Sequence, residues 1–167
     1  MNQLTHPKAV GDVTCAVVLS RLLEVFDAVL IPFGENQRYD LVVETEGSFS
    51  RVQCKTGRLR KGVIRFPCCS INYEHPTPRR GFYSRDYRGS ADFFGVYCPE
   101  TESVYLVPVR KVGRREGFLR VAPTKNNQSE RIRWAREFEL KLPSTPKSGF
   151  PDELDQRIVR ISSLFEG

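Results

Sequence analysis

Three polar residues on two neighbouring predicted strands are the part of this chain best suited to chemistry. Asp40 precedes the apolar run 41–43, and Gln53 and Lys55 lie on the following strand. Because side chains alternate across a strand, Gln53 and Lys55 share one face. If the two strands pair through the turn at 45–48, Asp40 lies near both of them. A carboxylate and an amide oxygen suit Mg²⁺, and an ammonium group stabilises charge on a phosphate, so the set predicts phosphodiester hydrolysis.

A purely structural interpretation of the same residues stays open at this point. Asp40 would then end a turn, and Gln53 and Lys55 would form the polar face of a half-exposed strand. Periodicity alone favours this simpler interpretation, because alternating polar residues are typical of any sheet with one wet face.

The elements around these residues predict an α/β chain with α+β character and a central mixed sheet of four or five strands flanked by helices. Apolar spacing predicts a helix over 11–26, and a short apolar run predicts a buried strand at 28–32. Further strands are expected at 39–44, 49–56, 62–66, 91–98 and 104–109, with a short edge strand at 118–121. A long segment without clear periodicity, rich in Pro, Gly, Arg and Tyr, covers 72–90.

The C-terminal part divides by composition. Residues 128–140 look helical and complete a core domain at 1–140. A Pro- and Ser-rich linker is expected at 141–150. A last helix, opened by Pro151 and Asp152, is expected within 151–167, where its apolar stripe suits oligomerisation or packing on its own domain.

The charge of the chain is concentrated in one region. The 167 residues carry 26 Lys and Arg against 20 Asp and Glu, for a net charge of +6. Residues 51–88 alone hold ten basic and two acidic residues, which makes this stretch +8 and the remainder slightly acidic. A second basic cluster covers 110–115. Arg dominates these clusters and aromatic residues are interleaved, which favours a surface for a polyanion such as DNA over an ordinary solvated face.

Cysteines and hydropathy exclude several classes of protein. The five cysteines, the adjacent pair Cys68 and Cys69 among them, lack a zinc-binding spacing, so we expect reduced, buried thiols. The N-terminus has no apolar segment typical of a signal peptide, and no long apolar run predicts a membrane span. These features together predict a cytoplasmic protein without a membrane partner.

The segments RYDLVV (38–43) and VQCKTG (52–57) resemble the PD-(D/E)XK nucleases. The closer resemblance is to the branch that contains bacterial group I intron homing endonucleases, where Gln replaces the usual acidic residue of the second motif. The resemblance extends through GENQR (34–38), DFFGVY (92–97) and VYLVP (104–108), and covers about residues 11–110.

The resemblance implies a restriction-endonuclease-like core that cleaves both strands of a long, specific DNA site with Mg²⁺, for which Mn²⁺ or Ca²⁺ can substitute at the metal site. It also implies a gene within an intron. Asp40 matches the metal-binding Asp, Gln53 the second-motif metal ligand and Lys55 the catalytic Lys. Cleavage of two strands needs two active sites, so a homo-oligomer is expected, either a dimer or a tetramer built as a dimer of dimers.

Cys15 departs from the family pattern. These nucleases usually carry a Glu on the first helix about four residues after its Gly, and from Gly11 that position is Cys15. A thiol is a poor ligand for Mg²⁺. Asp12 lies one turn away and is a partial substitute. We therefore expect this chain to bind DNA and to cut it slowly or not at all, whether Cys15 is natural or an introduced substitution.

DNA contacts are expected from a basic hairpin and from the long segment that follows it. The strands from Gln53 to Phe66 would form an extended β-ribbon in the major groove. The candidate DNA-binding residues are Arg58, Arg60, Lys61, Arg65, Arg79, Arg80, Arg85 and Arg88. Alternative functions are a catalytically degenerate DNA-binding protein, a restriction or junction-resolving nuclease, and an RNA-binding protein.

Overall fold

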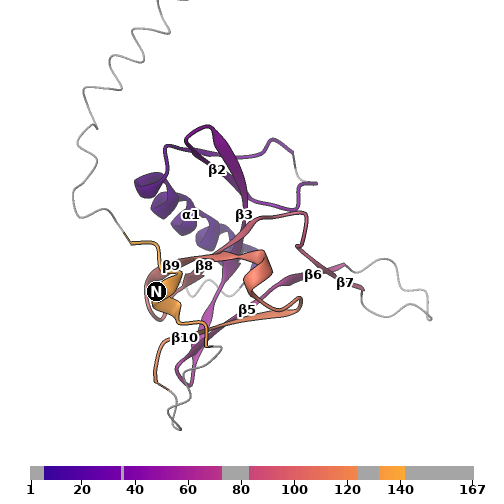
Figure 1. Cartoon of the computed structure of the whole chain (residues 1–167). Coiled ribbons are helices and arrows are strands. Elements are labelled where there is room, and N and C mark those ends of the chain that lie inside the picture. The colour runs from indigo at the N-terminus through magenta and orange to yellow at the C-terminus, as the bar shows by residue number, and fades with distance from the viewer. Residues whose placement is uncertain (1–5, 35, 73–82, 124–131, 142–167) are drawn as a thin grey trace, which may run out of the picture.

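A five-stranded mixed sheet forms the centre of the molecule (Figure 1). The structure, a computed structural model, describes residues 6–34, 36–72, 83–123 and 132–141. The strand order is β1-β2-β3-β8-β9, and only β3 and β8 run parallel. The strands are β1 (Ala28–Leu30), β2 (Leu41–Thr45), β3 (Ser48–Thr56), β8 (Phe93–Cys98) and β9 (Ser103–Pro108). The predicted mixed sheet and its strand number are thus confirmed for the described part of the chain.

Helix α1 (Pro7–Val25) covers one face of this sheet (Figure 1). It begins four residues before the predicted helix, with Pro in its first turn and His6 as the N-cap. Thr14, Val18 and Leu22 form its buried stripe. The helix approaches closely at Gly95 of β8, where an added Cβ would lie 2.7 Å from Val18 Cγ1. The lack of a side chain there sets the distance between α1 and the sheet.

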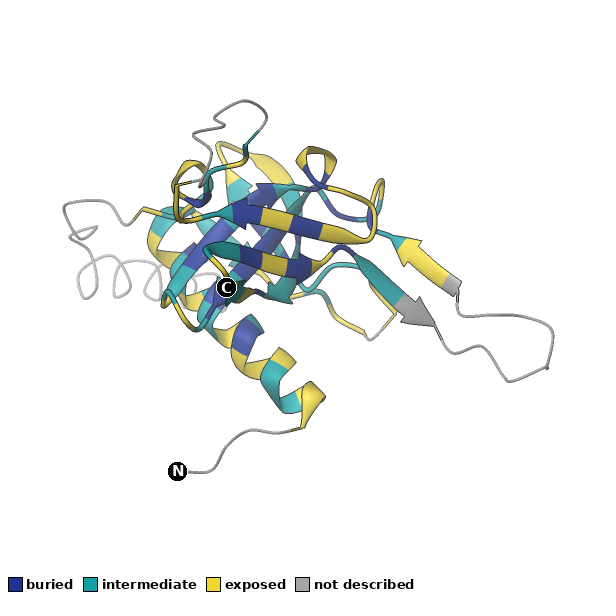
Figure 2. Cartoon of the chain, turned by 90° about the horizontal axis from the view of Figure 1, so that it is seen from below, coloured by how far each residue is buried: buried dark blue, intermediate teal, exposed yellow. Residues whose placement is uncertain are grey.

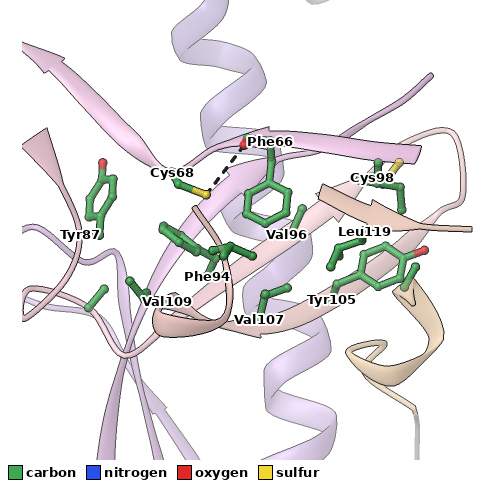
Figure 3. Packing of buried hydrophobic residues seen from close by; sticks show 14 residues of the cluster. Phe66, Cys68, Tyr87, Phe94, Val96, Cys98, Tyr105, Val107, Val109 and Leu119 are labelled. Carbon is green, nitrogen blue, oxygen red and sulfur yellow. Dashed lines mark hydrogen bonds between the residues drawn. The ribbon is translucent and has the colours of Figure 1, made fainter. Parts of the chain in front are cut away.

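A second, three-stranded sheet covers the other face, in the order β10-β5-β4. Its strands are β4 (Arg58–Arg60), β5 (Val63–Pro67) and β10 (Glu116–Arg120). Phe66 and Leu119 point inward and pack with Phe94 and its neighbours on the central sheet (Figure 3), and Ile64 belongs to the same buried cluster. The described part of the chain therefore has a helix on one face of the central sheet and a small sheet on the other.

The predicted basic hairpin is part of this second sheet and is not a free ribbon. Along β5, Ile64 and Phe66 are buried while Arg65 between them is exposed, an alternation visible on the strands facing the viewer in Figure 2. Residues Lys61 and Gly62 make the tight turn, with φ angles of 50° and 74°. Half of the hairpin thus belongs to the hydrophobic core, and its outer face alone is open to a partner.

Strands β6 (Cys69–Asn72) and β7 (Tyr83–Asp86) form a two-stranded ribbon (Figure 1). The sequence predicted neither strand: β6 precedes the segment 72–90 that lacks clear periodicity, and β7 lies within it. The residues that join them lie outside the described part. The sequence also missed β4. All three strands are only three or four residues long, too short for a period-two pattern to stand out.

Two further predictions were wrong. Residues 132–140, part of the predicted helix over 128–140, contain a single 3₁₀ turn, η2 (Ala135–Glu137). Their backbone pairs with strand edges instead: Leu106 N donates to Phe138 O (2.7 Å), and Arg120 N donates to Arg133 O (2.8 Å). Strand β1 is an edge strand and is not buried, because Leu30 is 44% exposed. The short helix η1 (Val109–Lys111) follows β9.

Several predictions fall outside the described residues. These are the linker from residue 142 on, the C-terminal helix within 151–167, and residues 128–131 of the other predicted helix. Within the described part, no helix is long and apolar enough to span a bilayer. The five cysteines are unpaired, and Cys68 and Cys98 alone are fully buried, while Cys15, Cys54 and Cys69 are half-buried.

Candidate active site

Asp40 lies directly before β2, at the rim of the central sheet, where the sequence predicts it. Its backbone N–H donates to Val52 O on β3 (2.9 Å). Its carboxylate oxygen Oδ2 accepts hydrogen bonds from the Cys54 backbone N–H (2.7 Å) and from Gln53 Nε2 (2.5 Å). The β2–β3 pairing, closed by a tight turn at Glu46 and Gly47, therefore brings Asp40 and Gln53 into direct contact.

The surroundings of Asp40 favour the neutral form of its carboxyl group. Burial raises the pKa of its carboxyl group above the usual value. Hydrogen bonds from Cys54 and Gln53 and the positive charge of Lys55 oppose this rise without cancelling it. A half-buried carboxylate with an incompletely compensated charge is typical of a site that binds a cation or a proton.

Lys55 lies on the same face of β3 as Gln53, opposite the face that α1 covers. Its ammonium group Nζ donates to the hydroxyl of Tyr87 (3.0 Å) and lies 4.4 Å from the centre of the Tyr87 ring. Its charge also acts on Asp40. Asp40, Gln53 and Lys55 therefore form one cluster, as their spacing predicts. Tyr87, which is only 6% exposed, was not predicted, since it lies in a segment without clear periodicity.

Cys15 faces Cys54, from α1 toward β3. The two thiols share a hydrogen bond that lowers the pKa of Cys15 and, together with burial, raises the pKa of Cys54. Asp40 and Asp12 are close enough to oppose the lowering at Cys15 by repulsion. Cys15 therefore lies on the α1 side of β3, near the Asp40 carboxylate. Asp12 itself is exposed.

The oxygen donors of this cluster fit a hard divalent cation. Mg²⁺ in proteins is commonly held by one or two carboxylates, with water and substrate phosphate oxygens completing its shell. Asp40 supplies a carboxylate and Gln53 an amide oxygen. In the described part of the chain, no group of three or more His, Cys, Asp or Glu side chains could hold a metal. Within the described part of the chain, Asp40 and Gln53 are the oxygen donors of this cluster.

Asp92 and Arg51 form a separate, structural pair. Arg51 binds the Asp92 carboxylate through two side-chain nitrogens, each at 3.0 Å, and through its backbone N–H at 2.8 Å. These bonds lower the pKa of Asp92. The pair ties β3 to the start of β8. Arg51 is therefore neutralised locally, and its charge does not contribute to a free basic surface.

The outer face of the β10-β5-β4 sheet is basic. Arg58 and Arg65 are register partners on neighbouring strands, and both are exposed, as is Arg60. Arg65 forms an ion pair with Glu116 (2.9 Å) and stacks on Phe118 (5.2 Å). Among described residues, neither Arg58 nor Arg60 makes an ion pair. Three of the predicted DNA-binding residues thus share one surface.

The other predicted DNA-binding residues lie elsewhere. Lys61 is exposed at the tip of the β4–β5 turn. Arg85 is exposed on β7, and Arg88 is exposed just after β7. Arg79 and Arg80 are outside the described residues.

The fold is of the restriction-endonuclease type. A family model described as "PD-(D/E)XK endonuclease" matches residues 5–141. The chain therefore belongs to the PD-(D/E)XK endonuclease family. No curated protein matches it.

The chain is also similar to a solved structure described as "The structure of a bacterial homing endonuclease: I-Ssp6803I". The TM-score is 0.61 at 22% identity, and the match covers 96% of this chain and 98% of the other. At this identity the likeness establishes the fold. The restriction-endonuclease-like core is thus confirmed, and the family membership agrees with the resemblance of the segments at 38–43 and 52–57.

Proposed function

We propose that this protein is a site-specific DNA endonuclease of the homing type, which hydrolyses phosphodiester bonds in both strands with Mg²⁺. The observation that carries the proposal is the contact between Asp40 and Gln53 beside the Lys55 ammonium group. Membership of the PD-(D/E)XK endonuclease family supports a nuclease, and the likeness to a bacterial homing endonuclease supports the homing type.

Asp40 and Gln53 would hold the metal ion through their side-chain oxygens, with Mn²⁺ or Ca²⁺ as substitutes. When bound, the ion supplies positive charge beside the scissile phosphate. The ammonium group of Lys55 stabilises the negative charge that develops on the phosphate oxygens during attack by water. The hydrogen bond from Gln53 fixes the Asp40 carboxylate, so that the oxygen ligands would be presented to a metal ion in a fixed geometry.

Duplex DNA with a long specific site is the proposed substrate. Arg58, Arg60 and Arg65 present charged groups together on the outer face of the second sheet, and Lys61 adds a charge at the turn. Arg suits bidentate contacts with phosphate and with guanine. Further contacts are proposed on and near the β6–β7 ribbon, from Arg79, Arg80, Arg85 and Arg88.

Cleavage of a randomised duplex library in Mg²⁺, Mn²⁺ and Ca²⁺, followed by sequencing of the ends, tests this function. We expect paired breaks at one recurrent sequence with Mg²⁺ or Mn²⁺, and binding without breaks in Ca²⁺. Breaks at unrelated positions would contradict site specificity. Breaks in one strand only would contradict a double-strand endonuclease.

A catalytically degenerate DNA-binding protein is the second candidate, and Cys15 is the observation that favours it. The Cys15 thiol lies near Asp40, at the position where the resemblance implies a Glu, and a thiol is a poorer ligand for Mg²⁺ than a carboxylate. The substitution Cys15→Glu separates the candidates. A slow nuclease gains activity when this substitution places a carboxylate within reach of Asp40, whereas a protein degenerate at several positions stays inactive. A restriction or junction-resolving role would appear as a different substrate preference in the same library.

A homo-oligomer in the bacterial cytoplasm completes the proposal. Two sites related by two-fold symmetry are needed to cut both strands, so we propose a dimer or a dimer of dimers. Analytical ultracentrifugation of the full chain, compared with a chain ending before Pro146, tests both the oligomer and the role of the C-terminal segment. A monomer at every concentration would contradict the proposal.

A further inference from the structure

We propose that Tyr87 is a positioning residue for Lys55, and that Arg38 ties both to the β6–β7 ribbon. This inference rests on the proposed function and deepens it. It names how the position of the Lys55 ammonium group depends on a part of the molecule that carries basic residues for DNA. Contacts of three side chains, Lys55, Tyr87 and Arg38, support it.

The Lys55 ammonium group depends on Tyr87 for its place. The side chain of Lys has four rotatable bonds and adopts many rotamers when unrestrained. Among the described residues, the Tyr87 hydroxyl makes the one hydrogen bond to Lys55 Nζ, at 3.0 Å. The same Nζ lies 4.4 Å from the ring centre. Because Lys55 is only half-buried, core packing does not hold its tip, and the hydroxyl fixes it near Asp40.

Tyr87 is itself held rigidly. Its side chain is 6% exposed, and its ring meets Phe94 edge-on, with ring centres 5.7 Å apart and an interplanar angle of 85° (Figure 3). Its carbonyl oxygen accepts hydrogen bonds from the backbone of Ser90 and Ala91, both at 3.0 Å. A hydroxyl on such a fixed ring is a precise anchor for a flexible ammonium group.

Arg38 links Tyr87 to the ribbon. Its guanidinium carbon lies 4.7 Å from the centre of the Tyr87 ring. Its Nη2 donates to Ser70 Oγ on β6 (3.3 Å) and to the Arg85 carbonyl on β7 (3.0 Å). Its Nη1 is buried and has no hydrogen-bond partner among described residues, so the aromatic ring is the favourable group beside this cation.

These contacts form a continuous path from the β6–β7 ribbon to Lys55. Both strands of the ribbon bond to Arg38, Arg38 stacks on Tyr87, and Tyr87 binds Lys55. Arg85, whose carbonyl is part of the path, presents an exposed basic side chain on the same ribbon. A strand that shifts when DNA binds there would therefore move the Tyr87 ring and the ammonium group with it.

The test is Tyr87→Phe, which removes only the hydroxyl and keeps the ring for Phe94 and Arg38. In a Cys15→Glu background, single-turnover cleavage of a selected duplex is expected to slow by about 10- to 100-fold, because the ammonium group is no longer fixed. The Kd for the same duplex in Ca²⁺ stays unchanged, since the loss affects the reaction and not ground-state binding. Arg38→Gln is expected to slow cleavage in the same direction.

The matched control is Tyr105→Phe. Tyr105 is 3% exposed in the same core, two strands from Lys55 in the central sheet, and its hydroxyl bonds Thr101 (3.0 Å) and not the Lys55 ammonium group. Its variant should cleave at the parent rate. A second readout needs no activity: in ¹⁵N-labelled protein, the Lys55 ammonium signal, assigned by its loss in Lys55→Arg, should exchange faster with water in Tyr87→Phe.

The inference is overturned if Tyr87→Phe cleaves like its parent while Lys55→Met is inactive, and the proposed function then still stands. It is also overturned if the Lys55 ammonium signal is the same with and without the hydroxyl. If cleavage survives Asp40→Asn and Lys55→Met alike, the cluster is not the active site, and the inference falls with that assignment. If the Cys15→Glu parent itself does not cut DNA, the proposed function fails, and the Lys55 ammonium signal alone decides the inference.

Discussion

If the basic outer face of the second sheet binds DNA, removing its arginines and removing the acidic partner of Arg65 should change the salt dependence of binding in opposite directions. Arg58 and Arg60 are exposed and make no ion pair among described residues, so each is free to contact a phosphate. Each phosphate contact contributes about 0.9 to the slope of log K against log salt concentration. The double variant Arg58→Gln/Arg60→Gln should therefore lower that slope by about 1.8.

The size of the effect on affinity follows from the same slope. Between about 50 and 200 mM salt, a slope change of about 1.8 corresponds to roughly a 12-fold smaller loss of affinity. Glu116→Gln is predicted to act in the opposite direction. It releases Arg65 from its ion pair at 2.9 Å, and a freed Arg65 that contacts a phosphate raises the slope by about 0.9.

The assay is fluorescence anisotropy with a labelled duplex in Ca²⁺, over a series of KCl concentrations. Lys8→Gln is the matched control, because Lys8 is exposed on α1, across the central sheet from this surface. The basic surface is refuted as a DNA contact if the double variant keeps the native slope, or if Lys8→Gln lowers the slope as much as the double variant does. A lower slope for Glu116→Gln would contradict the assigned role of its ion pair.

Three further predictions concern stability. Burial raises the pKa of Asp40, so the stability that this carboxyl group contributes is present below its unfolded-state pKa and is lost as the pH rises through its folded-state pKa. Asp40→Asn should therefore melt at a higher temperature than the native protein at pH 7, and a lower melting temperature would contradict this. In Gly95→Ala the added methyl group pushes against Val18, so the free energy of unfolding should fall by about 1–3 kcal/mol. Gly11→Ala lies in open space on α1 and should raise the free energy of unfolding by up to about 1 kcal/mol. Equal effects of the two variants in chemical denaturation would refute the close contact. Hydrogen bonds from Arg51 lower the pKa of Asp92, so the stability that this carboxylate contributes is present above its unfolded-state pKa and is lost as the pH falls through its folded-state pKa. Asp92→Asn should therefore melt below the native protein at pH 7, and melting curves should show this difference disappearing in acid.

The sequence predicts the elements around the candidate site well, because those elements are regular. Helix α1 and the strands β2, β3, β8 and β9 carry strong periodicity or sharp turn signals, and each was predicted to within a few residues. The contact between Asp40 and Gln53 follows from one tight turn, so register and proximity were both predictable.

The parts that were not predictable depend on contacts between distant segments. Residues 132–140 have a helical pattern, yet their backbone groups pair with β9 and β10, and this tertiary pairing outweighs local propensity. Tyr87 meets Lys55 only because β7 returns to the central sheet, which no local pattern encodes. The second sheet likewise depends on β10 reaching β5 across about fifty residues.

Cys15 shows that the position of a residue can be predictable when its surroundings are not. The count from Gly11 placed Cys15 at the position of a family Glu, and the structure brings its thiol near Asp40 and against Cys54. What the thiol faces could not be derived from the sequence, because it depends on how closely α1 approaches β3. That approach is set in part by Gly95 on the neighbouring strand.

The most direct test of the proposed mechanism is the rate at which supercoiled plasmid is cut in Mg²⁺ or Mn²⁺ by two proteins purified identically. The first is Cys15→Glu and the second is Cys15→Glu/Lys55→Met. The mechanism predicts that Cys15→Glu cuts faster than the native chain, and that loss of the Lys55 ammonium group slows cutting by about 10²- to 10³-fold. Equal rates for the two variants would contradict the claim that the cluster of Asp40, Gln53 and Lys55 hydrolyses DNA.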